Sequence, residues 1–145
     1  MRLPIVAVLG LVLSACQPTP AEPAVKYAWV RLPAVPGRPG AAYFTLAAGG
    51  SAVTLASVTT PAAKRAELHE SMAGAHGSMS MAPLASVAVP ANGAVTFAPG
   101  GRHVMLFDMD PKLKAGDETR LTLVLADGTQ LEAKARLRGA GDSVQ

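Results

Sequence analysis

Short strand-like segments that are interrupted by proline and glycine are the feature that most limits how this chain can fold. Its 145 residues include 12 prolines and 14 glycines, and the prolines interrupt most stretches that could otherwise form a helix. No long stretch keeps the hydrophobic period of about 3.6 residues that marks an amphipathic helix. Runs typical of strands lie at residues 25–32, 41–46, 52–58, 65–70, 84–89, 94–97, 103–107, 119–125 and 130–137. We therefore predict an all-β sandwich or barrel.

A hairpin near the C-terminus is the clearest local unit of this pattern. Leucines at every second position from Leu121 to Leu125 precede Asp127 and Gly128, a pair that favours a two-residue type I′ turn. In the return segment 131–138, small or leucine residues alternate with charged residues. One face of this hairpin should therefore lie in the core and the other in water.

The N-terminal residues are typical of an export signal. Arg2 precedes an apolar run over residues 3–13 that is too short to span a bilayer. The run ends in Leu-Ser-Ala before Cys16, which resembles the lipobox of bacterial lipoproteins, whose cysteine is acylated and becomes the new N-terminus. We therefore predict a signal peptide at 1–15 and a lipid on Cys16. An ordinary cleaved signal that leaves Cys16 as a free thiol is the alternative.

Beyond the signal, the chain divides into a tether, one domain and a tail. Residues 16–24 comprise the lipidated N-terminus and a proline-rich segment, which we expect to be an extended or flexible tether. Residues 25–138 suffice for one domain with a hydrophobic core, and residues 139–145 should form a flexible tail. Acyl chains on Cys16 would hold the domain at a membrane surface, of either the inner or the outer membrane.

The net charge of the chain and the positions of its basic residues indicate whether it could bind nucleic acid. The formal net charge is +3, and removal of Arg2 with the signal lowers it to +2. The basic residues are scattered along the sequence, whereas nucleic-acid binding requires them to be clustered. We therefore expect no nucleic-acid partner, and we expect the domain to be a monomer.

Histidine and methionine are concentrated in one part of the sequence. All three histidines, and every methionine except Met1, lie between residues 69 and 109. Imidazole offers a nitrogen ligand, and the soft thioether sulfur of methionine suits copper(I) far better than zinc, calcium or magnesium. The only cysteine is Cys16, which leaves no thiolate in the domain if it carries the lipid. This composition predicts a copper(I) site.

The spacing of these residues indicates which of them bind. His103 and Met105 lie two apart in a predicted strand, so both side chains project from the same face. Met79 and Met81 have the same relation in the segment before the 84–89 run. We favour His69, together with His103 and Met105, as ligands.

Three further residues could form a secondary metal site. Met72 and Met79 are each explained at least as well as gap-filling or surface methionines. His76 lies between alanine and glycine in a loop-like stretch, where a solvated side chain is the simpler interpretation. We keep these three only as secondary candidates.

The same spacing resembles a known family, the periplasmic copper chaperones called PCu(A)C. The pattern of that family is a histidine, a short spacer, a methionine, a spacer about twice as long and then histidine-any-methionine. Here the stretch 82–102 separates Met81 from His103 and matches the longer spacer, whereas the stretch 70–80 between His69 and Met81 exceeds the shorter one by a single position. The resemblance also covers Ala28-Trp29-Val30-Arg31, Ala41-Ala42-Tyr43, Ala66-Glu67-Leu68-His69-Glu70, Pro99-Gly100-Gly101 and Leu113-Lys114-Ala115-Gly116-Asp117.

This resemblance implies a fold, a ligand set and a function. The fold would be a cupredoxin-like Greek-key β-sandwich or barrel, and the ligands would be His69, Met81, His103 and Met105. Met79 remains the alternative to Met81, which the longer spacer favours. The function would be to carry one copper(I) ion in the periplasm and deliver it toward the copper centre of cytochrome c oxidase. Delivery would be to an oxidase subunit directly or through another copper-relay assembly protein.

Other functions remain open or are excluded by the residues present. Copper scavenging or storage would use the same four ligands, and a metal-free structural lipoprotein is a further alternative. A blue-copper electron carrier would need a cysteine thiolate. A hydrolytic metalloenzyme would need an open water position on a stronger Lewis acid than copper(I). We therefore expect no enzyme.

Overall fold

The computed structural model describes residues 21–142 and confirms the prediction of an all-β fold. The strands are β1 (Ala24–Arg31), β2 (Gly40–Ala47), β3 (Val53–Thr59), β4 (Ala63–Ala73), β5 (Met79–Pro83), β6 (Val87–Val89), β7 (Ala94–Phe97), β8 (Arg102–Met109), β9 (Glu118–Leu125) and β10 (Gln130–Arg138). One 3-10 turn, η1 (Ala75–Gly77), is the only helical element within these residues. In this part of the chain, no helix is long and apolar enough to cross a membrane.

Several sequence predictions fall on residues outside this range. They are the signal peptide at 1–15, the lipid on Cys16, most of the tether at 16–24 and the end of the tail.

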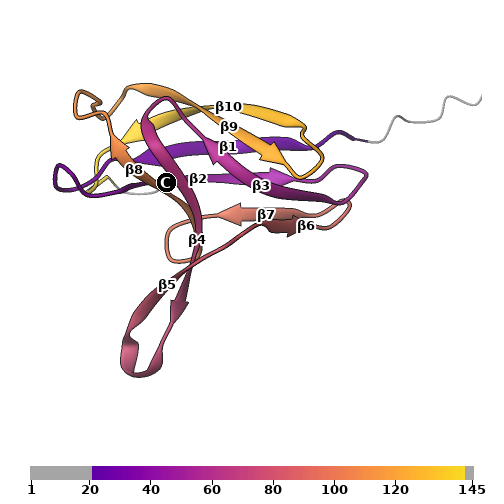
Figure 1. Cartoon of the computed structure of the whole chain (residues 1–145), viewed down its shortest axis with the longest axis horizontal. Helices are drawn as coiled ribbons and strands as arrows, with labels where there is room; N and C mark the ends of the chain where they lie inside the picture. Colours follow the sequence, from indigo (N-terminus) through magenta and orange to yellow (C-terminus); the bar gives the residue numbers. More distant parts are fainter. Residues whose placement is uncertain (1–20, 143–145) are drawn as a thin grey trace, which may run out of the picture.

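The strands form one sheet that curls around a single core (Figure 1). The hydrogen-bonded order is β5-β4-β8-β2-β1-β10-β9-β3-β6, and β7 also pairs with β2. The β1–β10 pair is parallel and every other pair is antiparallel. Strands β3 and β4 follow one another in the chain and contact each other, which brings distant parts of the sheet together. The neighbours β4–β8 and β2–β8 are far apart in sequence, as in Greek-key connections.

Alternation along the strands decides which side chains enter the core. In β8, Val104 and Leu106 are fully buried in the core, together with Leu68 of β4. The rings of Phe44 and Phe97 stack in the same core with their centroids 4.4 Å apart. Because side chains alternate along a strand, His103 and Met105 must leave β8 on the opposite, outer face.

The predicted C-terminal hairpin forms, but its predicted type I′ turn is wrong. The N–H of Gly128 donates to the carbonyl of Leu125 at 2.9 Å, and Gly128 alone in the loop has positive φ, at 87°. The loop is therefore a type I turn followed by a glycine in the left-handed region. The Asp127 carboxylate accepts a hydrogen bond from the N–H of Thr129 at 2.9 Å, which lowers the pKa of Asp127.

The largest difference from the predicted elements is a projecting hairpin made by β4 and β5 (Figure 1). Strand β4 continues to Ala73, beyond the predicted end at residue 70, and pairs with β5. The predicted strand at 84–89 is reduced to β6. Strand β5 has no β-branched or aromatic residue, so its strand structure comes from pairing with β4 rather than from its own propensity.

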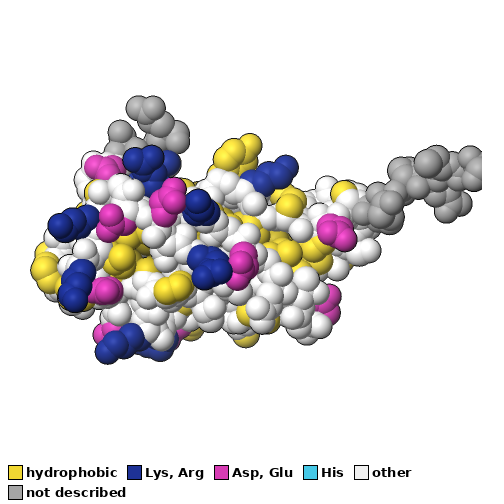
Figure 2. Space-filling view, turned by 90° about the horizontal axis from the view of Figure 1, so that it is seen from above, with side chains coloured by type: hydrophobic (Ala, Val, Ile, Leu, Met, Phe, Trp, Pro, Cys, Tyr) yellow, Lys and Arg dark blue, Asp and Glu magenta, His cyan; other side chains and the backbone are white. Residues whose placement is uncertain are grey.

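Charged side chains of both signs are interspersed on the face seen in Figure 2 and form no single basic or acidic area there. Ion pairs between neighbouring strands contribute to this mixture, such as Arg120 with Glu132 at 3.4 Å and Lys134 with Glu118 at 3.5 Å.

Gly40 at the start of β2 gives a first testable prediction, because the backbone there is closely approached. A Cβ at this position would press against the Met109 sulfur and lie 2.7 Å from the carbonyl oxygen of Arg31. Gly40→Ala should therefore lower the free energy of unfolding by about 1–3 kcal/mol, measured by chemical denaturation. Gly101→Ala is the control, since its Cβ would lie 3.7 Å from the nearest atom. Equal stability of the two variants would contradict the close approach at Gly40.

Candidate metal centre

The antiparallel β4–β8 ladder brings two of the three histidines together. In the β4–β8 ladder, His69 lies directly opposite His103, and both side chains project from the outer face. Their ring centroids are 6.0 Å apart with an interplanar angle of 34°. His103 is 5% exposed and the His69 side chain 14% exposed, so both imidazoles are largely removed from water.

Two methionines lie on the same outer face. Met105 follows His103 by two residues in β8 and lies opposite Glu67 of β4. Met81 lies on β5 opposite Ser71, which follows His69 by two residues in β4. The structure therefore brings the four predicted ligands onto one face of three neighbouring strands.

Three of these four residues, Met81, His103 and Met105, line a cavity of about 590 Å³. His69 does not line it but lies beside it, opposite His103. The segment 31–40 forms much of the opposite wall and covers this part of the sheet. The cavity wall contains Arg31 and Arg38 but no carboxylate.

His103 is held so that one ring nitrogen is free. Its Nδ1 lies 2.9 Å from the carbonyl oxygen of Gly101. A carbonyl can only accept, so Nδ1 carries the proton and donates it. In the neutral ring, the lone pair is then on Nε2, which is the form that can bind a metal.

His69 has a different hydrogen-bond arrangement. Its Nε2 lies 3.1 Å from Oε2 of Glu67, while its Nδ1 is buried and has no hydrogen-bond partner. The hydrogen bond with His69 is the main cause that lowers the pKa of the Glu67 carboxyl; partial desolvation opposes it, and Arg65 adds to the lowering. An ionised Glu67 can only accept, so Nε2 of His69 is the donor.

Aromatic and cationic side chains lie in the cavity wall near His103 and Met105. The Arg31 guanidinium lies 5.3 Å from the ring centroid of Trp29 and 5.6 Å from that of Tyr43. These stacked contacts hold the guanidinium at the cavity edge. Burial raises the pKa of the Tyr43 phenol, and the nearby Arg31 charge opposes this effect, so Tyr43 stays protonated and neutral.

The secondary candidates Met72, His76 and Met79 lie apart from the four predicted ligands. Met79 lies opposite Ala73 and Met72 opposite Ser80, both further out on the projecting hairpin, with 61% and 49% of their surfaces exposed. His76 lies in η1 at the hairpin tip, is exposed and has φ 60°. Within residues 21–142, no three His, Cys, Asp or Glu side chains are grouped so as to hold a metal ion.

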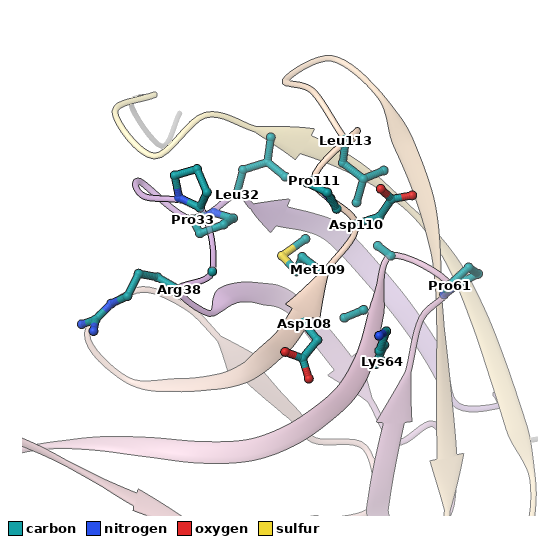
Figure 3. Close-up of a pocket in the computed structure, with 14 residues that line it drawn as sticks. Leu32, Pro33, Arg38, Pro61, Lys64, Asp108, Met109, Asp110, Pro111 and Leu113 are labelled. Atoms are coloured by element: carbon teal, nitrogen blue, oxygen red, sulfur yellow. The ribbon is translucent and has the colours of Figure 1, made fainter.

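A second and larger cavity, of about 790 Å³, is lined by residues other than the predicted ligands (Figure 3). It is lined by Met109 at the end of β8, by residues of the 31–40 segment and by the loop after β8. No histidine lines it, so the chemistry expected of the His–Met cluster has no counterpart there.

Sequence reasoning missed three residues of this site. Glu67 could have been found, because it precedes His69 by two residues and must share its face. Arg31 and Tyr43 come from strands that are distant from the histidines in the sequence. The only sequence evidence for them was that the segments around them resemble the PCu(A)C family.

The fold is that of PCuAC domains, as the sequence resemblance predicted, and it confirms the cupredoxin-like class. The chain is similar to the copper-bound PCuAC domain from PmoF2, with 20% identity and a TM-score of 0.67 over 83% of this chain and 96% of that chain. It is also similar to "CuI-DR1885" from Deinococcus radiodurans, with 29% identity and a TM-score of 0.56 over 86% of this chain and 83% of that one.

Residues 23–137 match the family "Putative lipoprotein LpqE-like", and the chain therefore belongs to this LpqE-like lipoprotein family. A protein of Leifsonia xyli subsp. xyli, "Putative lipoprotein Lxx21020", is 28% identical over 81 residues. That alignment covers 56% of this chain and spans about half (49%) of the Leifsonia protein.

Proposed function

We propose that this protein is a periplasmic copper(I) chaperone, held at the membrane by a lipid on Cys16. It would bind one copper(I) ion through His69, Met81, His103 and Met105 and deliver it toward the copper centre of cytochrome c oxidase. The observation that carries the proposal is the cross-strand pair of His69 and His103, with methionine sulfur from β5 and β8 on the same face. The similarity to a Cu(I)-containing structure at 29% identity supports it.

The donor atoms fit copper(I) rather than a harder ion. One ring nitrogen of His103 donates a hydrogen bond to Gly101, and one ring nitrogen of His69 donates to Glu67. The other nitrogen of each ring is therefore available to bind a metal ion. Two thioethers complete a neutral set of soft and intermediate donors. A monovalent ion in such a set is a poor Lewis acid, which favours a carrier over a hydrolytic enzyme.

Transfer rather than storage is favoured by the exposure of Met81. This side chain is 60% exposed and lies on the projecting β4–β5 hairpin, whereas His103 is almost fully buried. A partner could therefore replace Met81 as a ligand before the more buried ligands are released. The acceptor would be a cytochrome c oxidase subunit or another copper-relay assembly protein.

The first test is metal selectivity. The purified protein should bind one copper(I) ion, and a tenfold excess of zinc(II) should not displace it, because only copper(I) gains from two thioether ligands. A competition titration with a chromophoric copper(I) chelator measures both quantities. Displacement by zinc, or a stoichiometry other than one, would contradict the proposed ligand set.

The second test separates delivery from storage. Copper(I)-loaded protein is mixed with the apo form of the copper-bearing domain of an oxidase subunit, and the copper on each is measured after separation. Delivery predicts that copper moves to the acceptor faster than it dissociates into a chelator of equal affinity. Retention of the ion under these conditions would favour storage.

A further inference from the structure

Glu67 is not one of the four proposed ligands, but its carboxylate contacts the His69 ring. They are two residues apart on β4, so both side chains lie on the outer face. The carboxylate accepts a hydrogen bond from Nε2 of His69 at 3.1 Å, and Nδ1 of the same ring is buried without a partner. A buried polar atom without a hydrogen bond is costly, and a bound ion or water is one of the ways in which such an atom is satisfied in native structures.

Glu67 is itself held by its neighbours on the same face. Arg65 forms an ion pair with the Glu67 carboxylate, and its guanidinium lies 4.0 Å from the ring centroid of Phe107 in β8. Arg65 lies directly opposite Phe107 in the β4–β8 ladder, and Glu67 lies directly opposite Met105. A row of paired side chains therefore runs along the ladder toward His69 and fixes the direction of the carboxylate.

We propose that Glu67 is a positioning residue of the metal centre, which holds His69 in the tautomer that presents Nδ1 to the ion. This inference rests on the proposed function. Histidines that bind metals commonly donate their other ring N–H to a carboxylate or a backbone carbonyl, which fixes the tautomer and the ring orientation. His103 uses the second of these arrangements, with Nδ1 donating to Gly101. The two imidazoles would therefore bind through different nitrogens, Nδ1 of His69 and Nε2 of His103.

The chain offers a matched control for a test of Glu67. Glu70 lies on the same strand, next to His69, and is paired with Arg102 at 3.2 Å. The side chains of Glu67 and Glu70 are 38% and 36% exposed. Glu70 projects from the opposite face, so Glu70→Ala removes the same charge one residue from His69 without touching its ring.

The experiment compares copper(I) affinity in Glu67→Ala, Glu67→Gln and Glu70→Ala. Loss of a group that orients a metal ligand typically weakens metal affinity by about 10–100-fold, and we expect this loss for Glu67→Ala. Glu67→Gln should restore most of the affinity, because its amide oxygen still accepts from Nε2–H. Glu70→Ala should bind like the parent protein. Equal affinities for Glu67→Ala and Glu70→Ala would overturn the inference.

Nitrogen NMR of the histidine rings gives a readout that a purely structural role would not change. In the metal-free parent protein and in Glu67→Gln, His69 should carry its proton on Nε2, whereas Glu67→Ala should lose this preference. On addition of copper(I), the coordination shift should appear at Nδ1 of His69, and a shift at Nε2 instead would overturn the inference. If the parent protein binds no copper(I), the proposed function fails, and the tautomer measurement on the metal-free proteins still tests the effect of Glu67.

Discussion

Replacement of His103 by alanine is expected to weaken copper(I) binding by more than about 100-fold. Loss of a group that only orients a ligand already costs about 10–100-fold in metal affinity, and His103 would be a ligand itself. It is also the most buried of the four residues, at 5% exposure, and is fixed by its hydrogen bond to Gly101. A competition titration with a copper(I) chelator would measure the change.

Two variants separate a ligand effect from a folding effect. His76→Ala removes an imidazole from the exposed tip of the β4–β5 hairpin and should leave the affinity unchanged. Met105→Leu keeps nearly the same volume, so the sheet should keep its packing while the affinity still falls. If His103→Ala folds and binds copper(I) as the parent does, the ion is not held by this histidine pair.

Local rules were sufficient to predict which residues share a face of a strand. The two-residue period of a strand put His103 and Met105 together, and the structure has both on the outer face, with Val104 in the core. The same rule would have joined Glu67 to His69. It did not do so because only histidine and methionine were considered as parts of the site.

Contacts between strands could not be read from the sequence in the same way. The direct opposition of His69 and His103 depends on the register of two strands that are far apart in the sequence, which the core side chains of both strands set together. Strand β5 was missed because its structure depends on its partner β4 rather than on its composition. The spacing taken from the family resemblance was the only sequence signal that linked Met81 to the β8 residues.

The position of β5 bears directly on the choice between Met81 and Met79. The two methionines have almost the same exposure, 60% and 61%, and project from the same face of the hairpin. Met81 lies opposite Ser71 and lines the cavity with His103 and Met105. Met79 lies opposite Ala73, two residues and about 6.5–7 Å further from the histidines along the strand, and does not line that cavity.

Met81→Leu is therefore expected to weaken copper(I) binding by at least about tenfold, whereas Met79→Leu should change it by less than about twofold. Leucine has nearly the volume of methionine, and both positions are mostly exposed, so neither variant should alter stability appreciably. Because the two sites match in strand, face and exposure, a difference in affinity would report coordination by sulfur rather than packing. Copper(I) titrations of the two variants side by side make the measurement. A larger loss in Met79→Leu would assign the ligand to the outer methionine, and would require the hairpin to fold over the histidine pair when the ion binds.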